Sequence, residues 1–270
     1  MQGVFSLVIV IKNRFQLLAV FLVLAALVSL LQFVGGQAVK TVSGLLLARQ
    51  VPIYRVDVPE KKVAISFDAM WGTERTDRLL AVLRRHNVKT TFFLAGYWLE
   101  KNPDYVRKIA AEGHEIGNHS YTHPHMANLS PNQIREELEK THVLIKQLTN
   151  QDSFLFRPPF GEYNDRVIEG AAELGYYTIQ WSVDSLDWKN VSKDDIVRRI
   201  LQGLKPGDII LFHNDGLHTA AAVDEILAQL LHRGYQVVPV SQLIYKDGYF
   251  IEKHSGTQRR SKSQRLREEQ

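Results

Sequence analysis

The hydrophobic pattern of the chain separates a short apolar segment from a longer region in which strand-like and helix-like patterns alternate. From Phe15 to Val34 there is no charged residue, and Leu, Val, Ala and Phe dominate. A run of about 20 apolar residues matches the hydrocarbon thickness of a bilayer. No polar face interrupts it, as one would in a helix at the surface of a soluble domain. We therefore predict a transmembrane anchor at residues 15–34.

The charges beside this segment predict its orientation. Lys12 and Arg14 precede it, and positive charges tend to remain in the cytoplasm. We expect a cytoplasmic N-terminus at 1–14 and a single-pass protein of the cell membrane, in contact with its lipid, whose remaining part is extracytoplasmic. A cleaved signal peptide is the alternative. It would have a shorter apolar region of about 7–15 residues ending in small residues, and residues 35–38 form a poor cleavage site, so a retained anchor is favoured.

Beyond a predicted stalk at 35–60, residues 61–247 form one α/β domain. Short apolar or β-branched runs predict strands at 63–67, 90–94, 114–117, 154–156, 177–180, 209–212 and 236–238. Amphipathic runs predict helices at 76–86, 103–112, 130–148, 165–174, 194–201 and 220–232. About seven strands alternating with helices imply a parallel sheet. If that sheet closes, or nearly closes, it becomes a βα barrel.

Composition narrows the classes of chemistry. The chain has no cysteine, which excludes a disulfide framework, a thiolate zinc site and a cysteine nucleophile. The net charge is +4, and six basic residues against two acidic ones between Lys253 and Gln270 account for it. We expect 248–270 to be a disordered basic tail, with loose attraction to anionic lipid or wall polymer as an alternative. Because the basic excess is confined to this tail, no nucleic-acid partner is predicted.

Polar residues suited to catalysis follow the predicted strands. Those at or just beyond strand ends are Asp68, His119, His123, Arg157, Asp184, Asp187 and His213. Parallel βα folds gather the carboxyl ends of their strands on one face, where catalytic groups meet. This placement predicts one site built from distant parts of the chain.

Each residue also has a simpler structural interpretation. Asp68 can cap the following helix, and the pair His119 and His123 can lie in a polar surface loop. Arg157 can pair with a carboxylate, Asp187 can belong to a turn, and His213 can be a hydrogen-bonded core histidine. The shared placement at strand ends favours the site over these separate interpretations.

Five ordered motifs between residues 60 and 245 resemble the polysaccharide deacetylases of the NodB-homology type, carbohydrate esterase family 4. The corresponding segments are Ser66–Ala69 (Ser-Phe-Asp-Ala, where the family has Thr-Phe-Asp-Asp), His119–His123 (His-Ser-Tyr-Thr-His), Arg157–Gly161 (Arg-Pro-Pro-Phe-Gly), Asp187–Trp188 and Leu211–His213 (Leu-Phe-His). The resemblance implies a distorted (β/α)7 barrel preceded by the transmembrane helix.

The resemblance also implies roles. Asp68 would be the general base, oriented by Arg157, and His213 the general acid, tuned by Asp187. His119 and His123 would bind a divalent metal, zinc first, with cobalt or manganese as alternatives. The backbone N–H of Phe160 would stabilise the oxyanion, while Trp188 and Leu211 would line the acetyl pocket. The implied reaction is hydrolysis of N-acetyl groups on cell-wall glycan that contains GlcNAc or MurNAc.

The chain departs from the family at Ala69, where the family has a metal-binding Asp. Another group such as Asp68 or Asp184 would have to fill that position, the ion would be weakly held, or catalysis would be lost while glycan binding remained. The sequence from Asp68 to Gly72, together with the anchor, resembles the sporulation-associated branch, which implies a role in the spore cortex or cell wall. The competing function is a catalytically weak or inactive glycan-binding sporulation protein. A metal-dependent hydrolase of another acyl or phosphoryl bond lacks the expected basic cluster and Gly-rich loop.

Overall fold

The computed structural model of the chain describes residues 29, 32 and 50–261. The predicted cytoplasmic segment 1–14 and all but two residues of the predicted anchor 15–34 lie outside these residues. Within the described part of the chain, no helix combines the length and apolar character that a bilayer crossing requires.

A parallel sheet forms the centre of the domain. Its strands are β2 (Lys62–Ala69), β3 (Thr91–Leu94), β4 (Glu115–Asn118), β5 (Leu155–Phe156), β6 (Tyr177–Thr178), β7 (Val183–Asp184), β8 (Ile209–His213) and β9 (Gln236–Val237). The order is β6-β5-β4-β3-β2-β8-β7, and β9 pairs with the first residues of β2. All these pairs are parallel, as the alternating pattern predicts.

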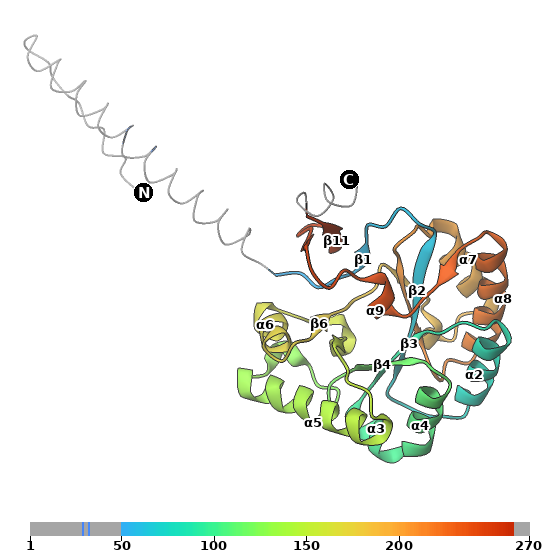
Figure 1. Cartoon of the computed structure of the whole chain (residues 1–270), viewed down its shortest axis with the longest axis horizontal. Coiled ribbons are helices and arrows are strands. Elements are labelled where there is room, and N and C mark those ends of the chain that lie inside the picture. Colours follow the sequence, from blue (N-terminus) through green and yellow to red (C-terminus); the bar gives the residue numbers. More distant parts are fainter. Residues whose placement is uncertain (1–28, 30–31, 33–49, 262–270) are drawn as a thin grey trace, which may run out of the picture. The chain divides into compact units, whose positions relative to one another are not determined.

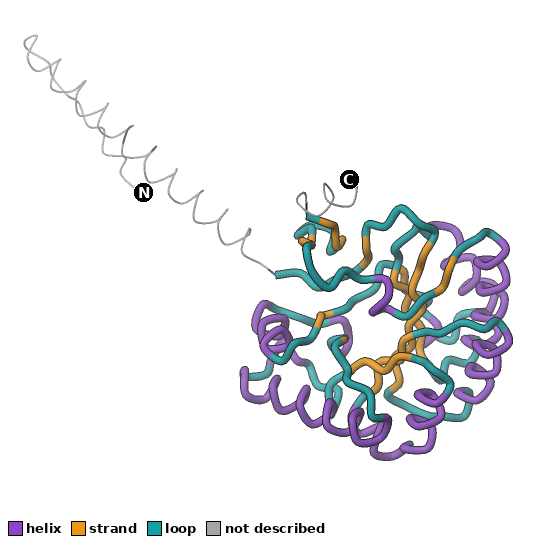
Figure 2. Tube along the Cα trace, viewed as in Figure 1, coloured by secondary structure: helices purple, strands orange, loops and turns teal. Residues whose placement is uncertain are grey.

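Helices surround the sheet on its outside, while the strands lie within (Figures 1 and 2). They are α2 (Thr76–Arg85), α3 (Gly96–Lys101), α4 (Pro103–Ala111), α5 (Pro131–Thr149), α6 (Asp165–Glu173), α7 (Lys193–Gly203), α8 (Thr219–His232) and α9 (Val240–Leu243). Apolar faces of these helices pack on the strands. In the core, the rings of Phe67 and Phe92 stack with centroids 4.9 Å apart, and Phe212 lies beside Phe67 at 5.8 Å.

Helix α5 shows how local sequence sets an element's limits. The side chain of Ser130 accepts a hydrogen bond from the N–H of Gln133, and the Gln133 side chain accepts one from the N–H of Ser130, which makes a capping box. Pro131 occupies the first turn, where its missing N–H costs nothing. Asn150 ends the helix in the left-handed conformation, with φ of 57°.

The expected (β/α)7 barrel is observed as a curled parallel sheet whose two edges, β6 and β7, are not joined to each other in the strand order. The segment before β2 contacts the edge strand β6 and the turn that precedes β8. The N–H of Ile53 donates to Thr178 O at 2.9 Å, and the N–H of Val56 donates to Gly207 O at 2.9 Å. The alternating pattern in the sequence predicts that neighbouring strands pair in parallel. It does not indicate whether the two edge strands, β6 and β7, pair with each other and close the barrel.

Two predictions for the ends of the domain are wrong within the described residues. Instead of a stalk up to residue 60 and a disordered tail from 248, β1 (Arg55–Val56), β10 (Tyr249–Ile251) and β11 (Thr257–Arg260) form a three-stranded sheet. Gln258 is fully buried and bonds both the N–H and the C=O of Tyr245. Arg259 pairs with Asp57 at 2.6 Å. The charge of Arg259, which we expected to be exposed in a solvated tail, is therefore neutralised by Asp57, a residue 202 positions earlier in the sequence.

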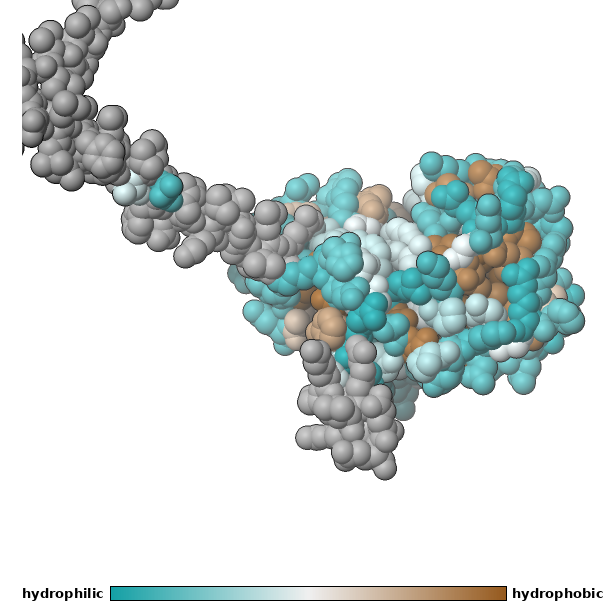
Figure 3. Space-filling view, turned by 90° about the horizontal axis from the view of Figure 1, so that it is seen from above, coloured by the Kyte–Doolittle hydropathy of each residue, from teal (hydrophilic) through white to brown (hydrophobic). Residues whose placement is uncertain are grey.

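The surface view from above shows hydrophilic residues over most of the visible face, with apolar side chains gathered in patches between them (Figure 3). Eight large apolar side chains are exposed in the described part of the chain: Trp71, Val143, Phe154, Phe160, Trp188, Leu217, Leu231 and Phe250. Five of these eight are aromatic.

Gly207 gives a test of the contact between the N-terminal segment and the sheet. Its φ is +82°, and a Cβ there would lie 1.6 Å from the carbonyl oxygen of Val56. Gly175 has a similar φ of +79° with no atom within 4 Å of its Cβ position. We expect Gly175→Ala to lose about 1–2 kcal/mol of unfolding free energy, the cost of the left-handed backbone alone. Gly207→Ala should lose about 1–3 kcal/mol more.

The measurement is urea unfolding of both variants beside the wild type. Equal losses would mean that the Val56 carbonyl moves away freely, and that residues 53–56 are not held against the sheet.

Candidate active site

A cavity of about 410 Å³ opens at the carboxyl ends of the strands. Its lining residues are Asp68, Met70, Trp71, His119, His123, Phe160, Gly161, Trp181, Asp184, Trp188, Leu211 and His213. They come from the ends of β2, β7 and β8 and from the segments that follow β2, β4, β5, β6 and β7. Seven of the nine residues to which the family resemblance assigns a role therefore line one cavity, as does Asp184. The other two, Arg157 and Asp187, bond directly to lining residues.

Asp68 and Arg157 form a buried ion pair at the base of this cavity. Arg157 Nη1 donates to Asp68 Oδ1 at 2.8 Å, and Arg157 is fully buried. Burial alone would raise the pKa of Asp68, but the charges of Arg157, His119 and His213 outweigh it and hold the pKa below its usual value. Asp68 is therefore a carboxylate at neutral pH, the form that a general base requires.

The loop that carries the histidine pair is shaped by two acceptors outside it. Asn118 Oδ1 accepts from the N–H of Ser120, and Glu137 on α5 accepts from the N–H groups of Tyr121 and Thr122. Ser120 and His123 take positive φ values of 63° and 57°. These bonds hold a backbone that would otherwise be unfavourable for side chains with a Cβ, so the two imidazoles meet with ring centroids 4.9 Å apart.

Both imidazoles are prepared as neutral ligands. His119 Nδ1 donates to the carbonyl of Arg157 at 2.7 Å, which leaves the Nε2 lone pair facing Asp68 Oδ2 at 3.6 Å. Burial lowers the pKa of His119, and burial together with the charge of His119 lowers the pKa of His123 to about 3. A lone pair opposite a carboxylate oxygen is an arrangement that a cation between them stabilises.

A divalent metal would nevertheless find an incomplete set of ligands. Among the described residues no three His, Cys, Asp or Glu side chains are grouped to hold an ion, whereas catalytic zinc sites use three protein ligands. Ala69 is fully buried within the apolar core rather than lining the cavity. Asp184 Oδ1 already accepts from the N–H of Leu186 at 2.8 Å. The residues present therefore fit two positions of a metal's coordination shell.

His213 and Asp187 form a second acid–base pair. His213 Nδ1 lies 2.7 Å from Asp187 Oδ1, while Asp187 Oδ2 accepts from the His213 N–H at 2.8 Å and from Thr219 Oγ1 at 2.5 Å. Burial disfavours the charged ring, but the hydrogen bond and charge of Asp187, with the charges of Asp68 and Asp184, raise the pKa of His213. With Nδ1 held, Nε2 is the nitrogen left to exchange a proton with a bound molecule.

The predicted pocket residues divide into one buried side chain and two exposed aromatics. Leu211 is buried, whereas Phe160 and Trp188 are 54% and 52% exposed. Phe160 has φ of 58°, and its ring lies edge-on to His123 with centroids 4.5 Å apart. Phe160 lines the cavity from the turn after Arg157, and the resemblance expects its backbone N–H to donate to an oxyanion.

Some residues of the site escaped sequence reasoning. Met70, Trp71 and Trp181 line the cavity, while Glu137 and Thr219 orient the groups that do. A signal existed for Trp71, because it follows the strand end directly. Glu137 and Thr219 gave none, since each lies within a helix that reads as ordinary amphipathic sequence.

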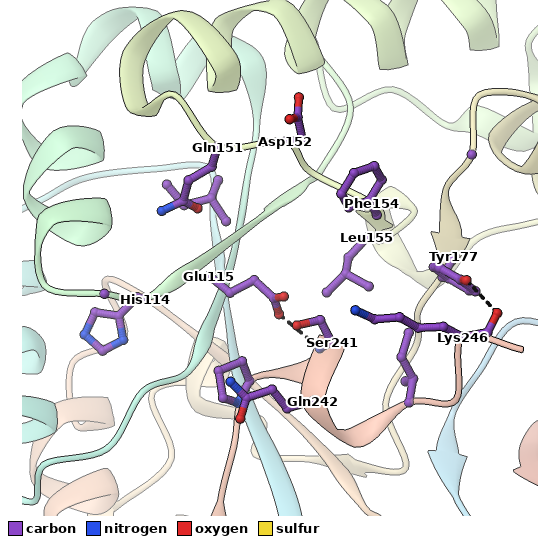
Figure 4. Close-up of a pocket in the computed structure, with 15 residues that line it drawn as sticks. His114, Glu115, Gln151, Asp152, Phe154, Leu155, Tyr177, Ser241, Gln242 and Lys246 are labelled. Atoms are coloured by element: carbon purple, nitrogen blue, oxygen red, sulfur yellow. Dashed lines mark hydrogen bonds between the residues drawn. The ribbon is translucent and has the colours of Figure 1, made fainter.

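A larger cavity of about 770 Å³ lies at the opposite, amino-terminal ends of β4, β5 and β6 (Figure 4). Its two carboxylates already have structural partners. Glu115 accepts from Thr91 and from the N–H of Ser241, and Asp152 pairs with Lys146 at 2.8 Å. His114 there accepts from the N–H of Thr90, and burial lowers its pKa to about 4. Size alone therefore does not indicate the reactive site, and the smaller cavity carries the acid–base groups.

Comparison with known proteins agrees with the geometry. The family model described as polysaccharide deacetylase matches residues 55–179. A peptidoglycan-N-acetylglucosamine deacetylase of Bacillus cereus is 39% identical over 186 residues, which are 67% of this chain and 68% of the relative. The uncharacterized protein YlxY of Bacillus subtilis is 37% identical over 193 residues, which are 72% of this chain and 60% of YlxY.

A solved structure adds a second kind of relative. The chain is similar to BA3943 of Bacillus anthracis, described as a pseudoenzyme of the CE4 family, with 38% identity, a TM-score of 0.70 and coverage of 73% of this chain and 69% of the other. A BA3943 mutant described as having restored enzymatic activity matches with 39% identity and the same TM-score of 0.70, over 73% of this chain and 72% of the other.

The histidine–aspartate pair gives a prediction about pH. We expect Asp187→Asn to lower the pKa of the His213 imidazole, measured by NMR titration, because the charge and acceptor that favour the protonated ring are lost. Asp184→Asn is the matched control. It removes one of the more distant charges without touching the ring, so its effect should be smaller.

The same pair links stability to pH. A pKa raised above the ordinary 6.5 of His213 means that the charged ring stabilises the fold below about pH 6.5, and that this contribution is lost as pH rises through the raised pKa. Asp187→Asn should flatten that dependence. A wild-type His213 that titrates below its ordinary value would contradict the assigned pairing.

Proposed function

The chain belongs to the polysaccharide deacetylase family, the NodB-homology type of carbohydrate esterase family 4, and from that membership we propose that it removes N-acetyl groups from cell-wall glycan containing GlcNAc or MurNAc. The observation that carries the proposal is the pair of opposite proton-transfer groups at one cavity. Asp68 is held as a carboxylate, and the hydrogen bond and charge of Asp187 raise the pKa of His213 and so favour its protonated form.

Amide hydrolysis needs both groups. An amide has a weakly electrophilic carbonyl and a poor leaving group, so a base must take a proton from the attacking water and an acid must protonate the departing amine. Asp68, oriented by Arg157, would take the first proton, and His213 Nε2 would deliver the second. The backbone N–H of Phe160 would stabilise the oxyanion, and Leu211 and Trp188 would enclose the acetyl methyl group.

A metal would complete this arrangement. His119 and His123 would hold a divalent ion, zinc first and cobalt or manganese as alternatives, and such an ion polarises the acetyl carbonyl and lowers the pKa of bound water. With two imidazoles as its protein ligands, we propose that the ion is weakly held and exchangeable.

The cellular setting belongs to the same proposal. The apolar segment 15–34 supports a single-pass anchor in the cell membrane with the catalytic domain outside the cytoplasm. The Trp-Gly sequence at 71–72, with this anchor, supports a role in the cell wall or spore cortex.

Ala69 favours a second function, a glycan-binding protein of the same fold with little or no catalysis. The similarity to the pseudoenzyme BA3943 points the same way. The two functions differ in one measurable product. Acetate release from N-acetylated peptidoglycan or chitooligomers, with and without added zinc, cobalt or manganese, is expected for the enzyme. Glycan binding without acetate release under every metal would establish the second function instead.

Substitution of Ala69 gives the sharper test of the metal site. We expect Ala69→Asp to bind zinc about tenfold or more tightly than the wild type, equivalent to about 1.4 kcal/mol, by calorimetry. Because Ala69 is fully buried, the new carboxylate should lower the melting temperature without metal. Added zinc should then raise it by more than in the wild type.

Ala69→Asn is the matched control, since it has nearly the same shape and no charge. It should be destabilised without gaining comparable zinc affinity. Equal zinc affinity in all three proteins would show that the metal does not bind beside residue 69.

A further inference from the structure

Trp71 is the most exposed large apolar side chain in the described part of the chain, with 59% of its surface accessible, yet it lines the candidate active-site cavity. It follows β2 on the loop to α2. Its ring lies 6.5 Å from the ring of His123, which in turn lies 4.5 Å from Phe160. The ring of His125 stacks on Phe160 at 4.5 Å. The four rings are therefore linked pair by pair, in the order Trp71, His123, Phe160 and His125, and the first three line the cavity.

Hydrogen bonds to three successive backbone carbonyls, those of residues 70–72, hold the loop that carries Trp71. Tyr97 Oη donates to Met70 O at 2.5 Å, and Trp98 Nε1 donates to Trp71 O. Asn214 Nδ2 donates to Gly72 O at 2.9 Å. Trp98 and Asn214 are themselves only 1% and 3% exposed. Donors from α3 and from the end of β8 thus fix the backbone on both sides of the exposed indole.

An exposed indole on a backbone held in this way fits a ligand better than it fits the fold. The domain gains little by leaving this apolar surface in water, and apolar surface beside a cavity marks ligand-binding regions. Fixing the loop in advance removes the ordering cost that a flexible aromatic would add to binding. The flat face of an indole matches the flat C–H face of a pyranose ring.

We infer that Trp71 is a stacking platform for an N-acetylhexosamine ring next to the one whose acetyl group enters the cavity. The inference rests on the proposed function for its substrate class, but not on catalysis. It assigns Trp71 to glycan binding and length selection, and it extends the site beyond the sugar that reacts.

The test measures binding of GlcNAc oligomers of one to six sugars by isothermal titration calorimetry. Trp71→Ala should bind the longer oligomers about five- to tenfold more weakly than the wild type, the change that one aromatic contact produces. Binding of the single sugar should change little. Trp71→Phe should recover part of the loss, because it keeps an aromatic face.

Phe154→Ala is the matched control, since Phe154 is 58% exposed but lines the cavity at the opposite end of the domain. It should bind every oligomer as the wild type does. Unchanged melting temperatures would show that the Trp71 variants fold, because the carbonyl contacts of residue 71 do not need its side chain.

Outcomes for this inference and for the proposed reaction are separate. If Trp71→Ala binds all oligomers as tightly as the wild type, or if Phe154→Ala weakens binding equally, the inference is overturned. A wild type that binds no oligomer overturns it as well. If the wild type binds longer oligomers more tightly and Trp71→Ala loses this gain, the inference is supported, even where no acetate is released. The absence of acetate release would reject only the catalytic proposal.

Discussion

The buried ion pair between Asp68 and Arg157 is the interaction on which both the fold and the site depend. It joins the end of β2 to the residue after β5, 89 positions later in the sequence. Arg157 also donates to Gln180 O, and its guanidinium lies 4.1 Å from the ring centroid of Phe93. A buried charge is costly unless it is paired. The strands can therefore close over this arginine only with the carboxylate in place, and the same contact directs the free oxygen of Asp68 toward His119.

The sequence predicts those parts of the fold in which the type of each residue indicates whether it is buried or where a helix begins. Runs such as Val63–Phe67 and Ile209–Phe212 are apolar because both faces of a parallel sheet are covered, and Ser130 with Pro131 marks a helix start by local chemistry. Val183–Asp184 was missed because Val183 stands between Ser182 and Asp184, whereas the other two-residue strands of the parallel sheet lie in apolar or β-branched runs. The sheet of β1, β10 and β11 was missed although Tyr249–Ile251 is an apolar run, because its partner Thr257–Arg260 is polar. Contacts such as Arg259 with Asp57 also lie outside any local window of sequence.

The site shows the same division. The groups that would act on a bound molecule are polar residues at the ends of apolar strands, and Asp68, His119 and His213 could be found from that position. They could then be assigned to one site, because the carboxyl ends of parallel strands lie on one face. Groups that orient them are ordinary residues in ordinary helices. Glu137 fixes the histidine loop from α5, and Thr219 holds Asp187 from the start of α8. Only the packing of those helices reveals these roles, and the packing depends on the whole core.

Two of the proposed catalytic residues also stabilise the fold, so their presence alone does not show that the protein is an enzyme. Asp68 neutralises a buried arginine, and Asp187 accepts from the His213 backbone and from Thr219. Each would stay under structural constraint in a protein that had stopped catalysing, because losing either one leaves buried polar groups unpaired. Ala69 carries no such duty. A buried methyl group at the end of β2 costs the fold nothing, whereas a carboxylate there is tolerated only beside a cation. Of these residues, only residue 69 is therefore informative about metal binding. The fold by itself maintains much of the acid–base geometry. The choice between an enzyme with an exchangeable ion and a glycan-binding relative thus depends on whether the ion binds.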